Sequence, residues 1–226
     1  MKQLFYLIII DFCLTSCSPR AYRGTEYIYL YKEKPKSILI APPVNKINDT
    51  RAINYISNIL ALPLIEKGYY VVPTAISLPD LKSDKAYNQM RDMNEILPYL
   101  KNKYGVDAVL FTIISHWEER IQQRHITAEV GISYMLLSTK SKQTLFEKQG
   151  VVVVDMNQPQ LISGRYATYS QIGLSSKDQS FREPVMAARY CGSYVFFDLP
   201  EGCYSPLYGR DLKERTGLDS FSVIIP

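Results

Sequence analysis

The sequence predicts an α/β fold with a three-layer mixed sheet, in which parallel strands joined by crossover helices are followed by an antiparallel hairpin. Two observations lead to this fold. Up to Ser115, short apolar runs that end at proline or glycine alternate with segments of helical periodicity, an order typical of parallel strands. From Ile126 onward, apolar and polar residues alternate one by one, as in a strand with one exposed face.

The first half of the body contains three predicted strands separated by helical regions. Residues 37–41 form a buried strand that stops at two prolines, which cannot donate to a β-ladder. A helix follows, capped by Asp49 or Thr50, kinked at Pro63 and closed by Gly68. The later elements are a strand over 69–72, a helical region from about residue 86 that restarts at Pro98 and ends at Gly105, and a central strand over 106–115.

The second half contains the hairpin and a tail. One strand covers 126–134, the chain turns at 138–142, and the second strand covers 144–154. Residues 181–194 are compatible with a helix, and the end of the chain is rich in proline, glycine and tyrosine. We expect residues 37–226 to form a single domain on which this tail packs.

Composition narrows the function classes. The chain has 226 residues with 46% hydrophobic and 21% charged residues, which is typical of a globular protein. Its net charge of +4 is spread along the sequence, so no basic stripe indicates a nucleic-acid partner. Two histidines and four cysteines offer few ligands, and we predict neither a metal site nor a cofactor.

The N-terminus has the pattern of an export signal. A lysine at position 2 precedes a short apolar run, and the segment ends in Leu14-Thr15-Ser16-Cys17, which resembles the bacterial lipobox. Asp11 is an unusual charge within the apolar run. We predict that residues 1–16 are removed, that Cys17 is lipidated, and that 17–36 form a tether. Within this tether, residues 27–31 could instead form a short edge strand.

Removal of the signal and acylation of Cys17 leave Cys191 and Cys203 in the body. A pair of cysteines in an oxidising compartment favours a disulfide, although one buried and one exposed thiol is the alternative. We find no nucleophile motif or phosphate loop, and His116 and His125 have no nearby nucleophile in a recognised motif. Glu118 and Glu119 are adjacent, but on a strand they face opposite ways and cannot act together as an acid and base pair. We therefore expect no catalytic residues and no enzyme activity.

Four blocks of sequence resemble a known family: residues 35–45, 63–73, 105–108 and 207–211. They are similar to bacterial lipoproteins of unknown function that include a meningococcal lipoprotein antigen. The resemblance implies a fold like the N-terminal domain of TolB and the periplasmic part of the curli-secretion lipoprotein CsgG. It implies no catalytic residues.

These observations favour a non-enzymatic lipoprotein of the outer membrane that faces the periplasm and acts as an accessory or scaffold in an envelope assembly or secretion complex. The alternatives are a small-molecule or glycan-binding module and, third, an envelope hydrolase. We expect membrane attachment through Cys17, and either a homo-oligomer or a companion CsgG-like lipoprotein as partner. The predicted contacts are Val152, Tyr204 and Tyr208, because the hairpin leaves an apolar edge that another subunit or the chain's own tail must cover. Lys148 is expected to guard this edge from the solvent side.

Overall fold

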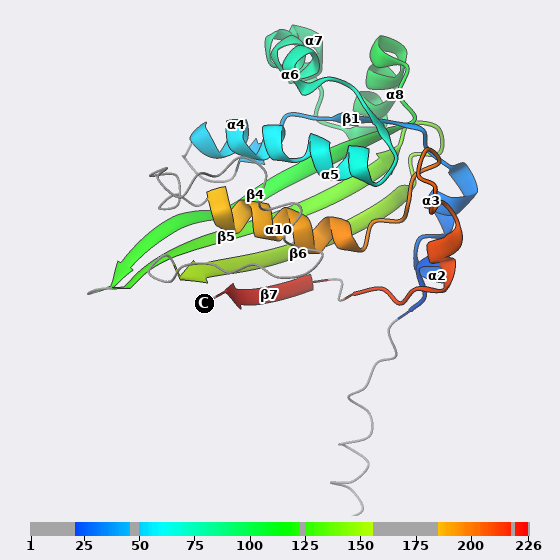
Figure 1. The fold of residues 1–226 in the computed structure, drawn as a ribbon. Coiled ribbons are helices and arrows are strands. Elements are labelled where there is room, and N and C mark those ends of the chain that lie inside the picture. The colour runs from blue at the N-terminus through cyan, green and yellow to red at the C-terminus, as the bar shows by residue number, and fades with distance from the viewer. Residues whose placement is uncertain (1–20, 46–49, 123–124, 156–184, 218–219, 226) are drawn as a thin grey trace, which may run out of the picture.

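The computed structural model describes residues 21–45, 50–122, 125–155, 185–217 and 220–225 of the protein and shows a mixed α/β fold (Figure 1). Its 7-stranded sheet has the order β3-β1-β4-β5-β6-β7, and β2 pairs with β4 beside this path. The strands are β1 (Ser37–Ile40), β2 (Val44–Asn45), β3 (Tyr70–Val71), β4 (Ala108–Gln122), β5 (His125–Ser138), β6 (Thr144–Asp155) and β7 (Ser220–Ile225). The helices are α2 (Arg23–Glu26), α3 (Ile28–Glu33), α4 (Thr50–Ile59), α5 (Ala61–Glu66), α6 (Thr74–Ser83), α7 (Lys85–Gln89), α8 (Met93–Tyr104), α10 (Val185–Phe197) and the 3-10 helix η2 (Arg210–Lys213).

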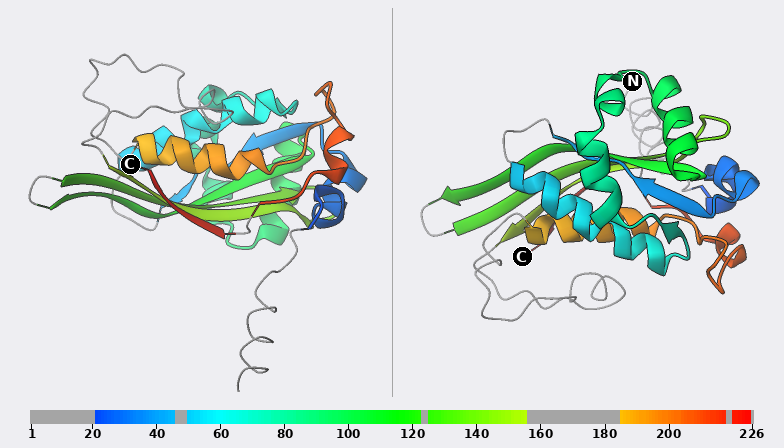
Figure 2. Two further views of the ribbon diagram at one scale, coloured as in Figure 1. Left: turned by 60° about the horizontal axis from the view of Figure 1, so that its bottom comes forward. Right: turned by 90° about the horizontal axis from the view of Figure 1, so that it is seen from above.

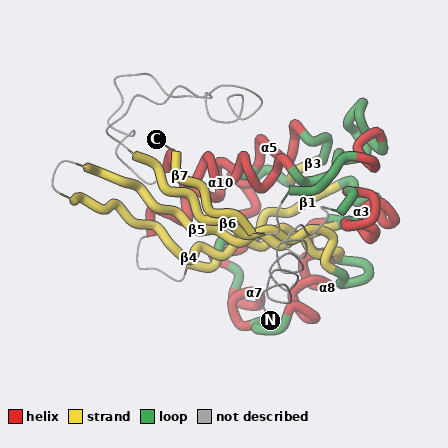
Figure 3. Tube along the Cα trace, turned by 90° about the horizontal axis from the view of Figure 1, so that it is seen from below, coloured by secondary structure: helices red, strands yellow, loops and turns green. Residues whose placement is uncertain are grey.

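The strand pairing confirms the predicted combination of parallel strands and an antiparallel hairpin. β1 pairs in parallel with β3 and β4, so the predicted central strand has a parallel neighbour on one side. β5 is its antiparallel neighbour on the other side, and β6 returns antiparallel to β5. β4 extends to Gln122, beyond the predicted end, because its polar second half pairs with the hairpin strand β5. β4 and β5 therefore project past the helices at one end of the molecule (Figure 3).

Between residues 50 and 104 the helices differ from the predicted regions in three respects. The predicted kinked helix is divided at Leu60 into α4 and α5. The helix α6 was not predicted, because Pro79 lies inside it and its apolar residues follow no clear helical stripe. Pro98 lies within α8 rather than at a restart, and Asp92 caps the start of α8 by accepting a hydrogen bond from the backbone N–H of Asn94. Gly105 ends α8 in the left-handed conformation, as expected.

Helices cover both faces of the sheet (Figure 2), and an apolar cluster of buried side chains lies on each face. The larger joins α4, α5 and α10 to the inward residues of β4, β5 and β6, such as Trp117, Tyr134 and Phe146. The smaller packs α8 against β1 and β4 through Leu97, Leu100 and neighbouring residues. The alternation seen in the hairpin sequence follows from this arrangement, since one face of β5 contacts α10 and the other does not.

The segment expected to be a tether is folded from Ala21 onward. α2 and α3 replace both the predicted solvated linker and the alternative edge strand at residues 27–31. Tyr27 and Leu30 are buried in the larger cluster, and Tyr22 forms a β-bridge with Arg215 of the C-terminal tail. The prediction of a tether over 17–36 is therefore wrong for residues 21–36. The aliphatic residues that bury this segment are too few for its helices to be detected by periodicity.

The C-terminal part folds back along the sheet. α10 confirms the predicted helix over residues 185–194 and extends to Phe197, while residues 181–184 lie outside the described residues; α10 packs on β5 and β6. The chain then continues through η2 to β7, which pairs in parallel with residues 149–154 of β6 (Figure 3). The chain's own tail thus covers the apolar part of the hairpin edge, which was the intramolecular alternative.

Candidate functional site

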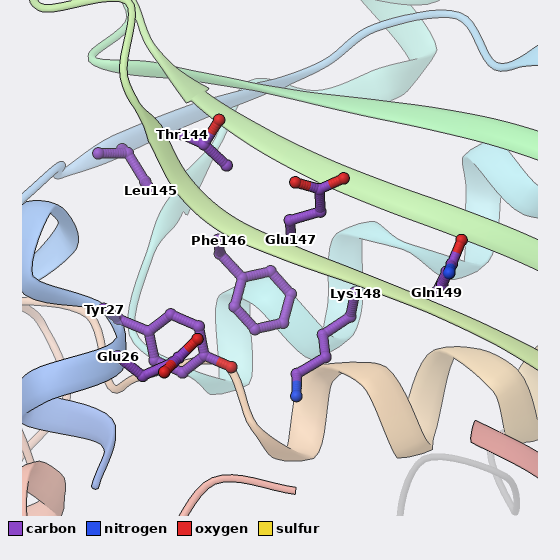
Figure 4. Close-up of a pocket in the computed structure, with 8 residues that line it drawn as sticks. All are labelled: Glu26, Tyr27, Thr144, Leu145, Phe146, Glu147, Lys148 and Gln149. Atoms are coloured by element: carbon purple, nitrogen blue, oxygen red, sulfur yellow. The ribbon is translucent and has the colours of Figure 1, made fainter. Parts of the chain in front are cut away.

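A pocket of about 420 Å³ lies against the first half of β6, beside the junction of α2 and α3 (Figure 4). It is lined by Glu26, Tyr27, Thr144, Leu145, Phe146, Glu147, Lys148 and Gln149. Six consecutive residues of one strand line it, so the pocket is a groove that follows the strand edge. We call these eight residues the β6 groove.

The groove exists because β7 covers only part of the edge of β6. Pairing between the two strands begins at Gln149 and Ser220 and runs toward the end of β6. Before β7, the chain turns away from β6: Arg215 bridges to Tyr22, and the backbone N–H of Thr216 donates to the carbonyl of Ala21 at 2.8 Å. Among the described residues, no strand therefore pairs with this side of β6 over residues 144–148.

The groove has an aromatic floor and an acidic rim. Phe146 is buried, and its ring centroid lies 5.2 Å from that of Tyr27. Glu26 and Glu147 are exposed and contribute carboxylates to the rim. An open strand edge bordered by carboxylates is suited to an extended peptide with basic or hydroxyl side chains, because the backbone pairs and the side chains complement the rim charge.

Lys148, at the end of the groove, points into the protein. Its side chain is only 2% exposed, and its Nζ lies 2.9 Å from Oδ2 of Asp198, which follows α10. Oδ2 of Asp198 also accepts a hydrogen bond from the backbone N–H of Gly217 in the tail. The expectation that Lys148 guards the edge in solvent is wrong, because Lys148 shares the inward face of β6 with Phe146.

Arg23 of α2 extends this cluster toward the N-terminus. Its guanidinium lies 2.9 Å from Glu214, 3.7 Å from Asp211 and 3.8 Å from Asp198, and it donates to the carbonyl of Phe197 at 2.7 Å. We call Arg23, Lys148, Asp198 and Asp211 the buried charge cluster; all four are at most 3% exposed. Its two positive and two negative side chains join α2, β6, α10 and the tail, so its arrangement indicates a structural role.

The same burial affects a neighbouring tyrosine. Desolvation, together with the carboxylate of Asp211, raises the pKa of the Tyr31 phenol well above its ordinary value. The hydroxyl therefore stays protonated at all physiological pH values.

The described residues hold no group of three histidine, cysteine or acidic side chains that could bind a metal ion. His116 is exposed on β4. No helix in the described ranges has the length and apolarity needed to cross a bilayer.

Several predicted site residues are placed differently from expectation, while Cys17 lies outside the described residues. Cys191 is buried on α10 with its Sγ 3.7 Å from the carbonyl oxygen of Gly150, whereas Cys203 is partly exposed in the tail, and both are free thiols. The predicted disulfide is therefore corrected: the helix directs one thiol at the sheet and the other lies in the outer turn. Val152 is fully buried in β6, which pairs with β7 at its edge and packs against α10, so it cannot contact a partner.

The two predicted tyrosines in the tail remain available. Tyr204 is 65% exposed and Tyr208 is partly exposed. Sequence reasoning missed the buried charge cluster because its members are far apart along the chain. One signal was present: Lys148 occupies an inward position in the alternating pattern of β6.

The fold and the groove define a class of protein: a single mixed α/β body with helices on both faces of its sheet and one partly open strand edge. The chain belongs to the family described as putative lipoprotein GNA1162-like, whose model matches residues 25–186. The match begins within α2 and ends at the start of α10, so the tail and β7 lie outside it. This confirms the family resemblance inferred from the sequence.

Individual relatives and solved structures share low sequence identity with this chain. The putative lipoprotein NMB1124/NMB1162 of Neisseria meningitidis serogroup B is 26% identical over 147 residues, which cover 65% of this chain and 68% of the relative. The crystal structure of lipoprotein GNA1162 from Neisseria meningitidis has 25% identity and a TM-score of 0.48, covering 56% of this chain and 88% of that one. The PelC dodecamer from Paraburkholderia phytofirmans has 11% identity and a TM-score of 0.42, covering 80% and 92%.

Proposed function

We propose that this chain is a non-enzymatic envelope lipoprotein that is anchored by lipid on Cys17 and binds an extended segment of a companion protein in the β6 groove. The partly open edge of β6 is the observation that carries the proposal. The role is that of an accessory or scaffold in an assembly or secretion complex at the periplasmic side of the outer membrane.

The anchor is supported by the lipobox pattern and by membership of a lipoprotein family. Ser18 follows the cysteine, so an aspartate that would retain a lipoprotein in the inner membrane of enteric bacteria is absent at this position. The likeness to the TolB N-terminal domain and to CsgG stays a prediction of the family resemblance.

Partner binding is supported by three properties of the groove. Its backbone edge is not paired with a described strand over residues 144–148. Its floor is formed by the rings of Tyr27 and Phe146, which are 6% and 1% exposed and make the base of the groove apolar. Its rim carries Glu26 and Glu147, which attract a basic segment and set its register.

The experiment places a photo-crosslinking amino acid at Gln149 or Glu147 in cells that make the acylated protein. We expect a discrete crosslinked product at these positions. Glu26→Lys should reduce its yield, because the substitution reverses charge on the rim. Glu95→Lys on α8, across the sheet, is the matched control and should leave the yield unchanged. Absence of a product, or equal yields in the two charge variants, would contradict the proposal.

A product whose mass corresponds to two copies of this chain would identify the partner as a second subunit. In that case, light scattering of the mature chain should show the same association. A strict monomer at high micromolar concentration would exclude this homo-oligomer.

A small-molecule or glycan ligand is the second candidate. It is supported by the pocket volume of about 420 Å³, which is within the usual range for ligand sites. A ligand that raises the melting temperature of the parent protein, but not that of a Phe146→Ala variant, would favour this function.

A further inference from the structure

The chain between the lipid and the folded body is short. The described fold begins at Ala21, whereas the predicted lipidated residue is Cys17. Four residues span at most about 14 Å even when fully extended. A folded domain of this size has a radius of gyration of about 17 Å. The body therefore cannot stand far from a membrane that holds Cys17, and the end that carries Ala21 has to face the lipid.

That end is formed by α2, α3 and the tail. The two helices lie beside η2 at one end of the sheet, opposite the projecting tip of β4 and β5 (Figures 1 and 2). Two backbone hydrogen bonds hold it together: the N–H of Arg23 donates to the carbonyl of Glu214, and the N–H of Thr216 to that of Ala21. A Cβ at Gly24 would lie 3.0 Å from the side chain of Leu212, which shows how closely α2 and η2 pack.

Half of the twelve large apolar side chains that are exposed among the described residues lie on these segments. Six large apolar residues of these segments are 41% to 65% exposed, namely Tyr22, Ile28, Tyr29, Tyr204, Leu207 and Leu212. We call these six residues the anchor-end surface. Tyrosine and aliphatic side chains exposed next to a lipid attachment point are suited to the membrane interface, where an apolar ring and a polar tip are both accommodated.

The charges on the same segments favour an anionic lipid surface. Exposed basic residues in α3, directly after it and in the tail are Lys32, Lys34, Arg210, Lys213 and Arg215. The exposed acidic residues of α2, α3 and the tail are fewer, namely Glu26 and Glu214, while Glu33 and Glu201 are half-buried. A local excess of positive charge attracts anionic headgroups, and each basic residue close to the surface contributes a similar increment.

We propose that the anchor-end surface lies on the membrane, so that α2, α3 and the tail contact lipid headgroups and fix the orientation of the body. This inference rests on the proposed anchor at Cys17. It assigns a membrane role to Tyr204 in place of the predicted contact with a partner protein.

The test measures the contact of single tryptophans with lipid. The acylated protein is reconstituted into phosphatidylethanolamine and phosphatidylglycerol vesicles, with or without brominated acyl chains, which quench nearby indoles. Tyr29→Trp and Leu212→Trp place an indole on the anchor-end surface. Ile76→Trp is the matched control, because Ile76 is 68% exposed on α6, which packs in the cluster on the other face of the sheet. The native Trp117 is 7% exposed and supplies a constant background.

We expect brominated lipid to remove most of the added emission from Tyr29→Trp and Leu212→Trp, with a blue shift, and to leave Ile76→Trp unchanged. Equal responses from all three positions, or none from protein that floats with the vesicles, would overturn the inference. A protein that carries no lipid and does not float would instead contradict the proposed anchor. A blue shift that appears without vesicles and grows with protein concentration would identify a second copy as the occupant and would also overturn it.

A second measurement is independent of acylation. The Cys17→Ser mature chain should bind phosphatidylglycerol vesicles weakly and less at high salt. Neutralising Arg210, Lys213 or Arg215 to Gln should weaken binding about fivefold per residue. Lys101→Gln on α8 is the control and should have no effect. Affinity that is unaffected by the three tail substitutions would contradict the membrane role of the basic residues.

Discussion

Replacement of Lys148 by methionine tests the buried charge cluster. Met has nearly the length of the lysine side chain but carries no charge, so it removes the ion pair with Asp198 and keeps most of the packing. The Lys148 Nζ lies 2.9 Å from Asp198, and both side chains are at most 4% exposed. The substitution therefore leaves a carboxylate in a site with little water.

The expected cost can be estimated from the remaining partners of Asp198. Removing one partner of a buried ion pair costs about 3 to 5 kcal/mol. Asp198 retains the N–H of Gly217 and the guanidinium of Arg23, which is 3.8 Å away. We therefore expect the low end, about 3 kcal/mol in the free energy of unfolding. With a slope of about 2 kcal/mol per molar urea, the midpoint should fall by about 1.5 M.

Urea unfolding of the mature chain, followed by circular dichroism, measures this loss. Lys140→Met, in the exposed turn of the same hairpin, is the control and should change the midpoint little. Adding Asp198→Asn should recover part of the loss, because the amide keeps an acceptor for Gly217 without the buried charge. A loss below about 1 kcal/mol for Lys148→Met, or additive losses in the double variant, would refute this interpretation of the cluster.

Three further predictions follow from single residues. Maleimide should label Cys203 in the native protein, whereas Cys191 should react only after unfolding, because burial raises the pKa of the Cys191 thiol to about 12. Protection of both thiols in the native protein would contradict the corrected cysteine assignment. Gly68→Ala should lower the free energy of unfolding by more than about 2 kcal/mol, because the φ angle of Gly68 is +82° and the new Cβ would lie 2.3 Å from a backbone nitrogen of the tail. The control is alanine at the glycine that ends α8, where a Cβ would meet nothing within 4 Å. An equal cost at both glycines would argue against the tail contact. Hydrogen bonding to the Lys103 ammonium lowers the pKa of Asp84, so the Asp84 carboxylate stabilises the fold above its unfolded pKa of about 3.9, and this contribution is lost as the pH falls below that value. The unfolding midpoint of Lys103→Met should therefore vary less between pH 4 and pH 2 than that of the parent. The same pH dependence in both proteins would contradict the pairing.

The sheet was predictable because its strands carry strong local signals. Proline ends β1, continuous apolar sequence characterises the first half of β4, and alternation characterises β5 and β6. Each signal arises from burial that repeats regularly along the strand. The family resemblance was also accessible, since its blocks 35–45, 63–73 and 105–108 fall within the matched residues 25–186, although the block 207–211 lies outside them.

The N-terminal segment was not predictable from such signals. α2 and α3 are short, and only a few of their residues, such as Tyr27 and Leu30, enter the core. What holds α2 in place is contact with residues almost two hundred positions away, including the bridge from Tyr22 to Arg215. Local periodicity contains no information about such contacts.

The groove was anticipated only in part. An incompletely covered hairpin edge follows from the order of strands, and cover by the chain's own tail was one of the two stated alternatives. The point at which β7 begins, opposite Gln149, decides which part of β6 stays open. That point depends on the buried charge cluster, because Lys148 and Asp198 hold the tail at Gly217 just before β7.

The lipid anchor is the claim on which the proposed function and the membrane orientation both depend. Mass spectrometry of the N-terminal peptide from protein extracted with detergent tests it directly. We predict that the peptide begins at Cys17 and carries a diacylglyceryl group on its sulfur. A peptide that begins at Met1, or one in which Cys17 has a free thiol, would contradict the account.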